Sequence, residues 1–234
     1  MAMNFFKSIK NRFNHYLYKN KKFDTEEEFY TYLFTKNPSW SSKEPNEDEN
    51  IRLAEIKNVI DGLKLNGKIN ILEIGCGRGW LSGKLAAYGN VTGIEPVEPV
   101  VKYAKKLFPD LEFHSDLPAT FIAKFPDKQF DLIVSSEVLE HVTDKKEFME
   151  QVGNMLKPGG VAIITTPRME HYNDFVSIYG SEPGQPVEEW MTEQEVKDLV
   201  LSSGFEIVKH HVFAPLPITD RTVNTTQLWA FRKK

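Results

Sequence analysis

The chain has 234 residues, of which 41% are hydrophobic, and a formal net charge of −4. This length suits one α/β core with appendages rather than two full domains. The acidic balance disfavours a large nucleic-acid surface, which draws its affinity from clustered lysines and arginines. The single cysteine, Cys76, excludes an internal disulfide, and no signal-peptide or membrane-spanning run appears. We therefore expect a cytoplasmic protein that acts on a small molecule.

Residues 1–22 form a basic arm with six lysines and arginines and no acid. Apolar and aromatic residues recur along it at helical spacing, which predicts an amphipathic helix. Three interpretations are open: a helix packed over the ligand cleft, a dimer contact, and a peripheral contact with an anionic membrane surface. Pro38 and Pro45 mark a loop between two helical pieces. We expect residues 1–48 to form a helical arm or lid and residues 49–234 the main domain, in a monomer or homodimer.

From residue 50 onward, helical and strand patterns alternate along the chain. Helices are expected over residues 50–63, 79–88, 97–107, 144–156 and 193–203. Strands are expected over residues 69–74, 91–94, 111–114, 130–135, 161–165, 205–212 and 227–231. Such alternation predicts βαβ units, and therefore a mainly parallel, doubly wound α/β sheet with helices on both faces. The connection from 212 to 227 contains no helix, so the last two strands should form an antiparallel pair.

The stretch ILEIGCGRGW, residues 71–80, ends the first predicted strand and turns into a helix. Ligands of open α/β sheets bind beyond the carboxyl ends of the strands, where glycines let the backbone approach closely. The spacing of Gly75, Gly77 and Gly79 differs from the dinucleotide pattern G-x-G-x-x-G, because a tryptophan stands where its third glycine would be. Glu73 repels phosphate and attracts an amine. The turn therefore favours a ligand without a pyrophosphate.

The segment LEIGCGRG resembles motif I of the class I S-adenosylmethionine (SAM) dependent methyltransferases. Further motifs follow in that family's order: VTGIEP, FHSD, FDLIVSSEVLEHV, and LKPGG before AIITTP. The similarity covers residues 50–212 and extends to the small-molecule O-methyltransferases of the ubiquinone-biosynthesis type. It implies a Rossmann-like seven-stranded sheet with its last strand antiparallel, SAM as methyl donor and S-adenosylhomocysteine as product. A Rossmann-type domain for another nucleotide is the alternative.

The resemblance assigns the SAM contacts to the ends of the first four strands. It implies Glu73 near the methionine amino group, Glu95 at the ribose and Asp116 at the adenine. Glu95 also stands 22 positions after Glu73, the distance at which an acid meets ribose hydroxyls in nucleotide-binding α/β folds. Cys76 is expected to pack within the turn rather than to react. The complete expected set is Glu73, Gly75, Cys76, Gly77, Gly79, Glu95, Pro96, Asp116, Leu117, Ser136 and Glu137.

A hydroxyl acceptor needs a base or a metal to help remove its proton. His141, just beyond the fourth strand, is the first candidate base, with a structural histidine capping the turn as its alternative, and His171 is the second. Glu137, Glu140 and His141 also reproduce the E-x-x-E-H pattern of some magnesium-assisted O-methyltransferases. The small-RNA members of that group place a further histidine before a Trp-Thr pair, whereas this sequence reads PVEEWMT. That departure disfavours Mg²⁺ as a cofactor.

Substrate contacts are expected from the basic arm and from the insert after the fifth strand, TPRMEHYNDFVSIYGSEPGQPVEEW. The candidates in the insert are Arg168, Tyr172, Tyr179 and Trp190, of which Arg168 suits a carboxylate or a phosphate. The adjacent His210 and His211 point to opposite faces of one strand, so at most one of them reaches a site.

The expected reaction is in-line methyl transfer from SAM to a hydroxyl of a small molecule, promoted by alignment of the reacting atoms. The N/D-P-P-Y motif of exocyclic-amine methylating enzymes does not follow the fourth strand, where the sequence reads SSEV. Three alternatives stay open: N-methylation of a small molecule, RNA 2′-O-methylation with a Glu/Glu/His metal site, and a non-catalytic SAM-binding module.

Overall fold

The computed structural model describes residues 21–233 except residue 66 and the segments 181–184 and 218–221. The predicted helix of the basic arm therefore lies almost wholly outside the described residues. The helices are α2 (Glu26–Thr35), α3 (Glu47–Gly62), α4 (Trp80–Leu85), α5 (Glu98–Leu107), α6 (Pro118–Lys124), α7 (Lys145–Met155), α8 (Tyr172–Tyr179) and α9 (Glu193–Ser202), with 3₁₀ turns η1 (Leu139–His141) and η2 (Met169–His171). The strands are β1 (Ile69–Ile74), β2 (Gly89–Ile94), β3 (Glu112–His114), β4 (Phe130–Ser136), β5 (Leu156–Pro167), β6 (Phe205–Pro217) and β7 (Thr222–Lys233).

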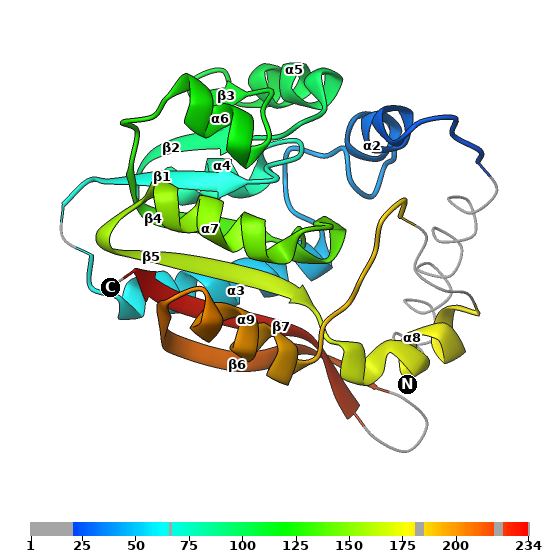
Figure 1. The fold of residues 1–234 in the computed structure, drawn as a ribbon. Coiled ribbons are helices and arrows are strands. Elements are labelled where there is room, and N and C mark those ends of the chain that lie inside the picture. Colours follow the sequence, from blue (N-terminus) through cyan, green and yellow to red (C-terminus); the bar gives the residue numbers. More distant parts are fainter. Residues whose placement is uncertain (1–20, 66, 181–184, 218–221, 234) are drawn as a thin grey trace.

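The seven strands form one sheet in the order β3-β2-β1-β4-β5-β7-β6 (Figure 1). The first five strands are parallel, and β7 runs antiparallel to both β5 and β6. Ile71 of β1 pairs with Val91 of β2 on one side and with Leu132 of β4 on the other. The predicted Rossmann-like sheet, with an antiparallel last strand, is confirmed.

Helices cover both faces of this sheet (Figure 1). On one face α6, α7 and α9 pack on the strands, and Met149 and Val200 belong to that core. On the other face α3 and α4 bury Ile56 and Leu81 against the sheet. Because strands covered on both faces have no polar side, β1 and β4 read as continuous apolar runs rather than as alternating patterns.

Local capping sets where two helices begin. The Asn46 side chain accepts from the Glu49 N–H at 2.9 Å, and Glu49 accepts in return from the Asn46 N–H at 2.8 Å. Thr192 and Glu195 form the same reciprocal box at the start of α9. These boxes satisfy N–H groups that the first turn of a helix leaves unpaired.

The structure contains two helices that the periodicity did not predict. α6 has 7 residues, which is too short for a helical repeat to show, and its proline at the first position suits the start of a helix. α8 lies within the insert that was predicted only as a substrate-contacting segment. α4 is shorter than the predicted helix over 79–88, because Gly79, with a left-handed φ of 80°, only caps it and residues 86–88 form the turn that leads into β2.

The last three strands are longer than predicted. β5 begins at Leu156, which pairs with Phe130, so the KPGG segment runs within the strand and shifts the register there. The ladder between β6 and β7 continues through Phe213 with Thr226 and Pro215 with Asn224, where a long connection was expected. Prolines concealed this extension in the sequence, since they are rare within strands.

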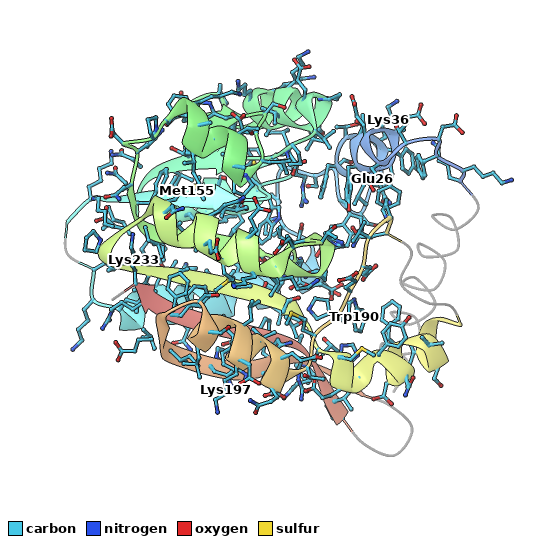
Figure 2. All side chains as sticks on the ribbon, viewed as in Figure 1. Glu26, Lys36, Met155, Trp190, Lys197 and Lys233 are labelled. Atoms are coloured by element: carbon cyan, nitrogen blue, oxygen red, sulfur yellow. The ribbon has the colours of Figure 1, made fainter. Side chains whose placement is uncertain are left out.

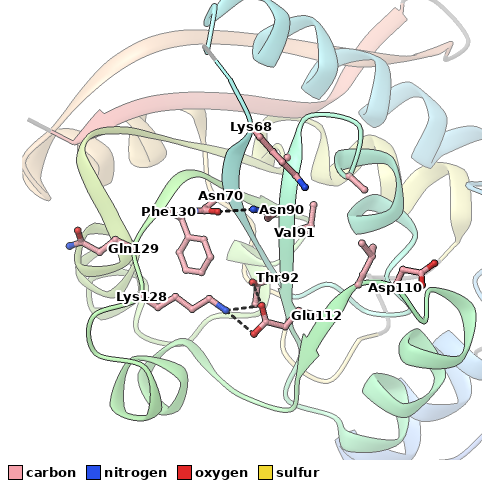
Figure 3. Close-up of a pocket in the computed structure, with 13 residues that line it drawn as sticks. Lys68, Asn70, Asn90, Val91, Thr92, Asp110, Glu112, Lys128, Gln129 and Phe130 are labelled. Carbon is pink, nitrogen blue, oxygen red and sulfur yellow. Dashed lines mark hydrogen bonds and ion pairs between the residues drawn. The ribbon is translucent and has the colours of Figure 1, made fainter.

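A cavity of about 600 Å³ opens where β1, β2, β3 and β4 begin (Figure 3). Its polar lining is internally paired: Lys128 Nζ lies 2.7 Å from Glu112 Oε1, and the Thr92 hydroxyl donates to Glu112 Oε2 at 2.8 Å. The glycine turn follows the opposite end of β1. The cavity is therefore separate from the predicted ligand site.

Within the described residues, no helix is both long and apolar enough to cross a bilayer.

Candidate functional site

The glycine turn joins β1 to α4 at the carboxyl edge of the sheet. Gly75 and Gly77 adopt φ of +70° and +48°, values that side chains disfavour. A Cβ on Gly75 would lie 2.4 Å from Val138 Cγ2, and a Cβ on Gly77 would lie 3.1 Å from the ring of Phe34. The Gly75 N–H donates to the Ile94 carbonyl at 2.9 Å, which fastens the turn to β2. The turn thus requires glycine, because Val138 and Phe34 pack directly against its backbone.

Cys76 is part of the core rather than of an open surface. It is 2% exposed and packs with Ala104 of α5 and Phe113 of β3. Burial raises the pKa of its thiol well above the ordinary value, with the charges of Glu73 and Glu95 acting in the same direction. A thiol that keeps its proton is a poor nucleophile, in agreement with the expected packing role.

Glu73 ends β1 and is 3% exposed. Its carboxylate accepts a hydrogen bond from the Ser82 hydroxyl of α4. Burial raises the pKa of Glu73 to about 8, although Ser82 and the charge of Arg78 oppose the rise. The carboxyl is therefore largely protonated at neutral pH, and a cationic group bound beside it would favour its ionised form.

Glu95 follows β2 and lies next to the glycine turn, 6% exposed. Its two carboxylate oxygens accept from the Val97 N–H at 3.1 Å and from the Gly77 N–H at 3.2 Å. Burial raises the pKa of Glu95 to about 7, and these two N–H groups oppose the rise. The carboxylate of Glu95 therefore links the end of β2 to the glycine turn that follows β1.

Asp116 follows β3 and is 5% exposed, with Lys124 Nζ 2.5 Å from its Oδ1. Leu117 beside it is 55% exposed, so an apolar side chain faces outward next to a buried acid. Pro96 is exposed, and its carbonyl accepts from the Ser115 hydroxyl at 3.1 Å. The expected adenine and ribose contacts therefore share the edge formed by β2 and β3.

The end of β4, Ser136 with Glu137 after it, forms a floor beside Thr165 of β5. Ser136 and Thr165 have their hydroxyl oxygens 2.9 Å apart, and the Thr165 hydroxyl also lies 3.0 Å from Glu137 Oε1. Glu137 adopts a φ of +57°, and its N–H donates to the Thr165 carbonyl at 2.9 Å. Arg52 of α3 approaches this carboxylate, with Nη1 3.9 Å from Oε2, and its buried Nε has no hydrogen-bond partner among the described residues.

His141 ends η1 beyond this floor. Its Nδ1 lies 2.5 Å from the Val187 carbonyl, and its Nε2 lies 3.7 Å from Glu140 Oε1. Burial lowers the pKa of His141, and the charge of Lys145 acts in the same direction, whereas the bond to Val187 opposes them. Glu140 is 2% exposed and accepts from the Thr166 hydroxyl at 3.0 Å.

The E-x-x-E-H residues are not arranged as metal ligands. Glu137 is engaged by Thr165, and Glu140 by Thr166, while the imidazole Nδ1 is taken up by a backbone carbonyl. No group of three His, Cys, Asp or Glu side chains in the described part of the chain is placed to hold a metal ion. Burial raises the pKa of Glu140 well above its ordinary value, and the charge of Glu137 adds to the rise.

Helix α2 covers the carboxyl edge of the sheet, next to α5 (Figure 1). Its Tyr30 packs on the His141 ring with centroids 6.4 Å apart and planes at 72°, and Phe34 stacks on Tyr30 with centroids 6.3 Å apart. The Phe34 ring also faces the Gly77 backbone. α2 therefore spans the space between the glycine turn and His141. A helical piece was predicted here, but neither Tyr30 nor Phe34 was among the predicted site residues. Their spacing of four, which places them on one helix face, was the available signal.

The segment after α2 is tied to the glycine turn by Arg78. Arg78 is fully buried. Its Nη1 lies 2.7 Å from Oε1 of Glu49 in α3, and its Nη2 lies 2.7 Å from Oε2 of the same carboxylate. Its Nε donates to the Ser42 carbonyl. Tyr103 of α5 adds a hydrogen bond to the Ser41 carbonyl at 2.9 Å. The sequence signal for this anchor was an arginine inside an otherwise small and apolar turn.

The insert after β5 folds back onto β7. The predicted base His171 is 3% exposed, and its Nε2 lies 2.7 Å from the Thr225 carbonyl, so this nitrogen carries the proton. Arg168 Nη1 donates to the Asn224 carbonyl at 2.7 Å, and Nη2 pairs with Glu193. Both side chains therefore hold the insert to the sheet. Among the described residues, neither Arg168 nor His171 has a hydrogen bond or a ring contact with His141.

Trp190 contacts three other rings of the insert. Its ring lies 5.0 Å from His171, 5.3 Å from Tyr172 and 5.4 Å from Phe175 between centroids, and its N–H donates to Glu188 at 2.8 Å. Figure 2 shows Trp190 at one end of the strap that rises from the insert toward α2. This strap, residues 185–192, reaches the floor where the Glu189 N–H donates to the Glu140 carbonyl.

His210 and His211, the adjacent histidines singled out in the sequence, both lie on β6. His210 stacks on Trp229 with centroids 3.8 Å apart, while His211 Nε2 lies 2.8 Å from Glu55 of α3, so the two histidines do point to opposite faces. Neither of them contacts His141. Tyr179 ends α8, and its side chain lies outside what the structure describes.

Comparison with known proteins identifies the family. A family model described as a methyltransferase domain matches residues 47–210. The ubiquinone biosynthesis O-methyltransferase of Ruegeria pomeroyi is 30% identical over 182 residues, which cover 69% of this chain and 72% of that protein. The enzyme of the same name from Rickettsia typhi is 35% identical over 125 residues, 50% of each protein. The chain spans about half the length of the first curated relatives that it matches, 48–53%.

Solved structures show the same fold. The N-methyltransferase NodS from Bradyrhizobium japonicum, in complex with S-adenosylhomocysteine, matches with a TM-score of 0.66 and 19% identity, covering 89% of this chain and 99% of that one. A protein from Pyrococcus horikoshii matches with a TM-score of 0.69 and 18% identity, covering 86% and 98%. The glycine turn, the acids at the ends of β2 and β3, and these comparisons agree, and the chain belongs to the class I SAM-dependent methyltransferases.

Proposed function

We propose that this enzyme transfers the methyl group of SAM to a hydroxyl of a small molecule, with His141 as the general base. The observation that carries the proposal is the 2.5 Å contact between His141 Nδ1 and the Val187 carbonyl. A carbonyl only accepts hydrogen bonds, so Nδ1 carries the proton and Nε2 keeps its lone pair. The free lone pair is the group that a base needs.

The protonation state of His141 supports the same role. Burial lowers its pKa below the ordinary value of 6.5, so the imidazole is neutral at pH 7. A base that is already neutral accepts the acceptor's proton as the new bond forms. Turnover should rise with pH while His141 loses its proton, in a range below pH 6.5, and should be level above that range.

The residues around the glycine turn fit SAM. The turn is built from glycines with positive φ, which let the backbone come close to a ligand, and this suits the methionine part. We assign Glu95 to the ribose hydroxyls and Asp116 to the adenine amino group, and the exposed Leu117 to the face of the purine. Arg52, with its unpaired Nε, is the group we assign to the methionine carboxylate. Bound SAM supplies an electrophilic methyl group, so the protein needs no covalent nucleophile of its own.

The acceptor side rests on α2 and the insert. Aromatic side chains border the His141 region from both: Tyr30 directly, and Trp190 through the strap that carries Val187 and Glu188. A lining of aromatic side chains with a few polar groups is typical of small-molecule sites. The names of the relatives add support, because those from Ruegeria and Rickettsia are O-methyltransferases.

The test is a panel of small phenols, catechols and amines, with release of S-adenosylhomocysteine as the readout. We expect turnover with a hydroxyl acceptor, confirmed by the mass and position of the product methyl group. His141→Ala should lower kcat roughly 10²- to 10⁴-fold, the usual contribution of a general base. Affinity for S-adenosylhomocysteine, measured by calorimetry, should stay within about threefold, since His141 is not among the donor contacts.

The control is His211→Gln, which removes a histidine bonded to Glu55 away from the site and should leave kcat unchanged. Full turnover in His141→Ala would refute its role and indicate that no base is required, since His171 is buried and bonded to Thr225. Turnover with amines alone, or with RNA alone, would refute the hydroxyl acceptor.

A further inference from the structure

Tyr30 of α2 lies against the proposed base but belongs to a different part of the chain. Its ring meets the His141 imidazole edge to face, at 6.4 Å between centroids, within the range of favourable aromatic pairs. The other polar neighbours of the ring are the carbonyl of Val187 at Nδ1 and, at 3.7 Å from Nε2, the carboxyl of Glu140. The position of the imidazole therefore depends on two segments that are distant in sequence from η1.

Tyr30 is itself held by its neighbours on α2. Phe29 packs on it at 5.0 Å with planes at 89°, and Phe34 stacks on it at 6.3 Å with planes at 12°. Phe34 faces the backbone of Gly77, where a ligand of the glycine turn would also lie. One row of rings therefore connects the donor side of the site with the base.

The groups around this contact leave the Tyr30 hydroxyl protonated. Burial raises the pKa of Tyr30, and the carboxylates of Glu26, Glu95, Glu140 and Glu188 add to the rise. A phenol in this setting is not a base. Its ring remains a neutral surface against which the imidazole can rest.

We propose that Tyr30 is a positioning residue, whose ring fixes the His141 imidazole in the orientation that keeps Nδ1 bonded to Val187 and leaves Nε2 toward the acceptor. This inference rests on the role proposed above for His141. It assigns to α2 a part in the acceptor half of the site, in addition to covering the glycine turn.

The test reads the imidazole directly. Protein labelled with ¹⁵N-histidine is studied by NMR at pH 8, with and without saturating S-adenosylhomocysteine, and the His141 signals are identified by their loss in His141→Gln. Ring nitrogen shifts distinguish the two neutral tautomers. We expect wild type and Tyr30→Phe to show a single Nδ1–H tautomer, and Tyr30→Leu to show averaged shifts from both tautomers.

Kinetics separate positioning from donor binding. With a hydroxyl acceptor found in the panel above, Tyr30→Leu should lower kcat about tenfold, while affinity for S-adenosylhomocysteine changes less than threefold. Tyr30→Phe should recover most of the loss, since it restores the ring. The matched control is Tyr32→Leu on the same helix, where the ring packs on Phe23 and under Lys21 instead of His141. It should behave as wild type in both measurements.

An unchanged Nδ1–H tautomer in a Tyr30→Leu protein that binds S-adenosylhomocysteine would overturn the proposal. If Tyr30→Leu fails to bind it, Phe34→Leu decides, because it removes the ring that stacks on Tyr30. Partial averaging in Phe34→Leu supports the positioning role, and wild-type shifts refute it. The NMR result does not depend on turnover, so absence of hydroxyl methylation in wild type would refute the proposed function separately.

Discussion

The donor half and the acceptor half of this site are built in different ways. The donor half takes its acids from residues 73–117, where each of the first three strands has one buried acid at or just after its carboxyl end: Glu73, Glu95 or Asp116. The acceptor half brings together Tyr30 from α2, His141 from η1 and Val187 from the strap. The sheet itself places the donor groups, whereas the acceptor groups meet only because distant segments dock on one another.

This difference has a functional meaning. Donor groups fixed by the strands cannot vary without altering the sheet, so a common donor site is the expected property of the fold. The acceptor groups lie on a helix and a strap outside the sheet, which can change while the sheet is kept. Substrate choice is therefore expected to reside in α2 and the insert.

The two halves meet at Arg78, and its replacement should have the largest effect. Arg78→Met leaves Glu49 buried without its partner, which costs about 3–5 kcal/mol. For a chain of this size the melting temperature should fall by roughly 6–20 °C, measured by calorimetry. Lys84→Met is the control, because it breaks an exposed pair with Glu44 and should shift the melting temperature little. A shift of Arg78→Met no larger than that of the control would show that the halves do not depend on this anchor.

Glu95→Ala should have the next largest effect, restricted to the donor half. It removes the proposed acceptor for the ribose hydroxyls and leaves the N–H groups of Gly77 and Val97 unpaired. Affinity for S-adenosylhomocysteine should fall by about 1–3 kcal/mol, or roughly 5- to 150-fold, in isothermal titration. Glu112→Gln, at the opposite edge of the sheet, should bind as wild type. Unchanged affinity in Glu95→Ala would contradict the assignment of the end of β2 to the ribose.

The donor half and the acceptor half also differ in how well the sequence predicts them. The sheet, its antiparallel last strand and the glycine turn were predictable, because apolar strands and glycine spacing are local signals. The contact between Tyr30 and His141 joins positions 111 apart and leaves no periodic trace in either segment. Arg168 and His171 were chosen as polar residues of the insert, but they bond to the carbonyls of Asn224 and Thr225. The pairing of β5 with β7 sets these partners. Local patterns therefore predict the donor half, and tertiary docking decides the acceptor half.

The smallest expected effect concerns the acid buried under the glycine turn. Burial raises the pKa of Glu73 from 4.5 to about 8, so between these values the folded protein keeps a proton that the unfolded chain releases. Stability must then fall as pH rises through this window, by up to about 1 kcal/mol between pH 6 and pH 7 from this group. Glu73→Gln should remove that share of the slope, about 2–4 °C in melting temperature across the same interval.

Glu112→Gln is the control for this pH dependence. Burial raises the pKa of Glu112, but hydrogen bonds from Lys128, His114 and Thr92 lower it to about 2. Its contribution is therefore present above pH 4.5 and is lost only as pH falls toward 2, outside the interval studied. Glu112→Gln should keep the wild-type slope between pH 6 and pH 7. If Glu73→Gln keeps that slope too, the acid under the turn is ionised in the folded protein, and the donor half carries a permanent negative charge before the cationic donor arrives.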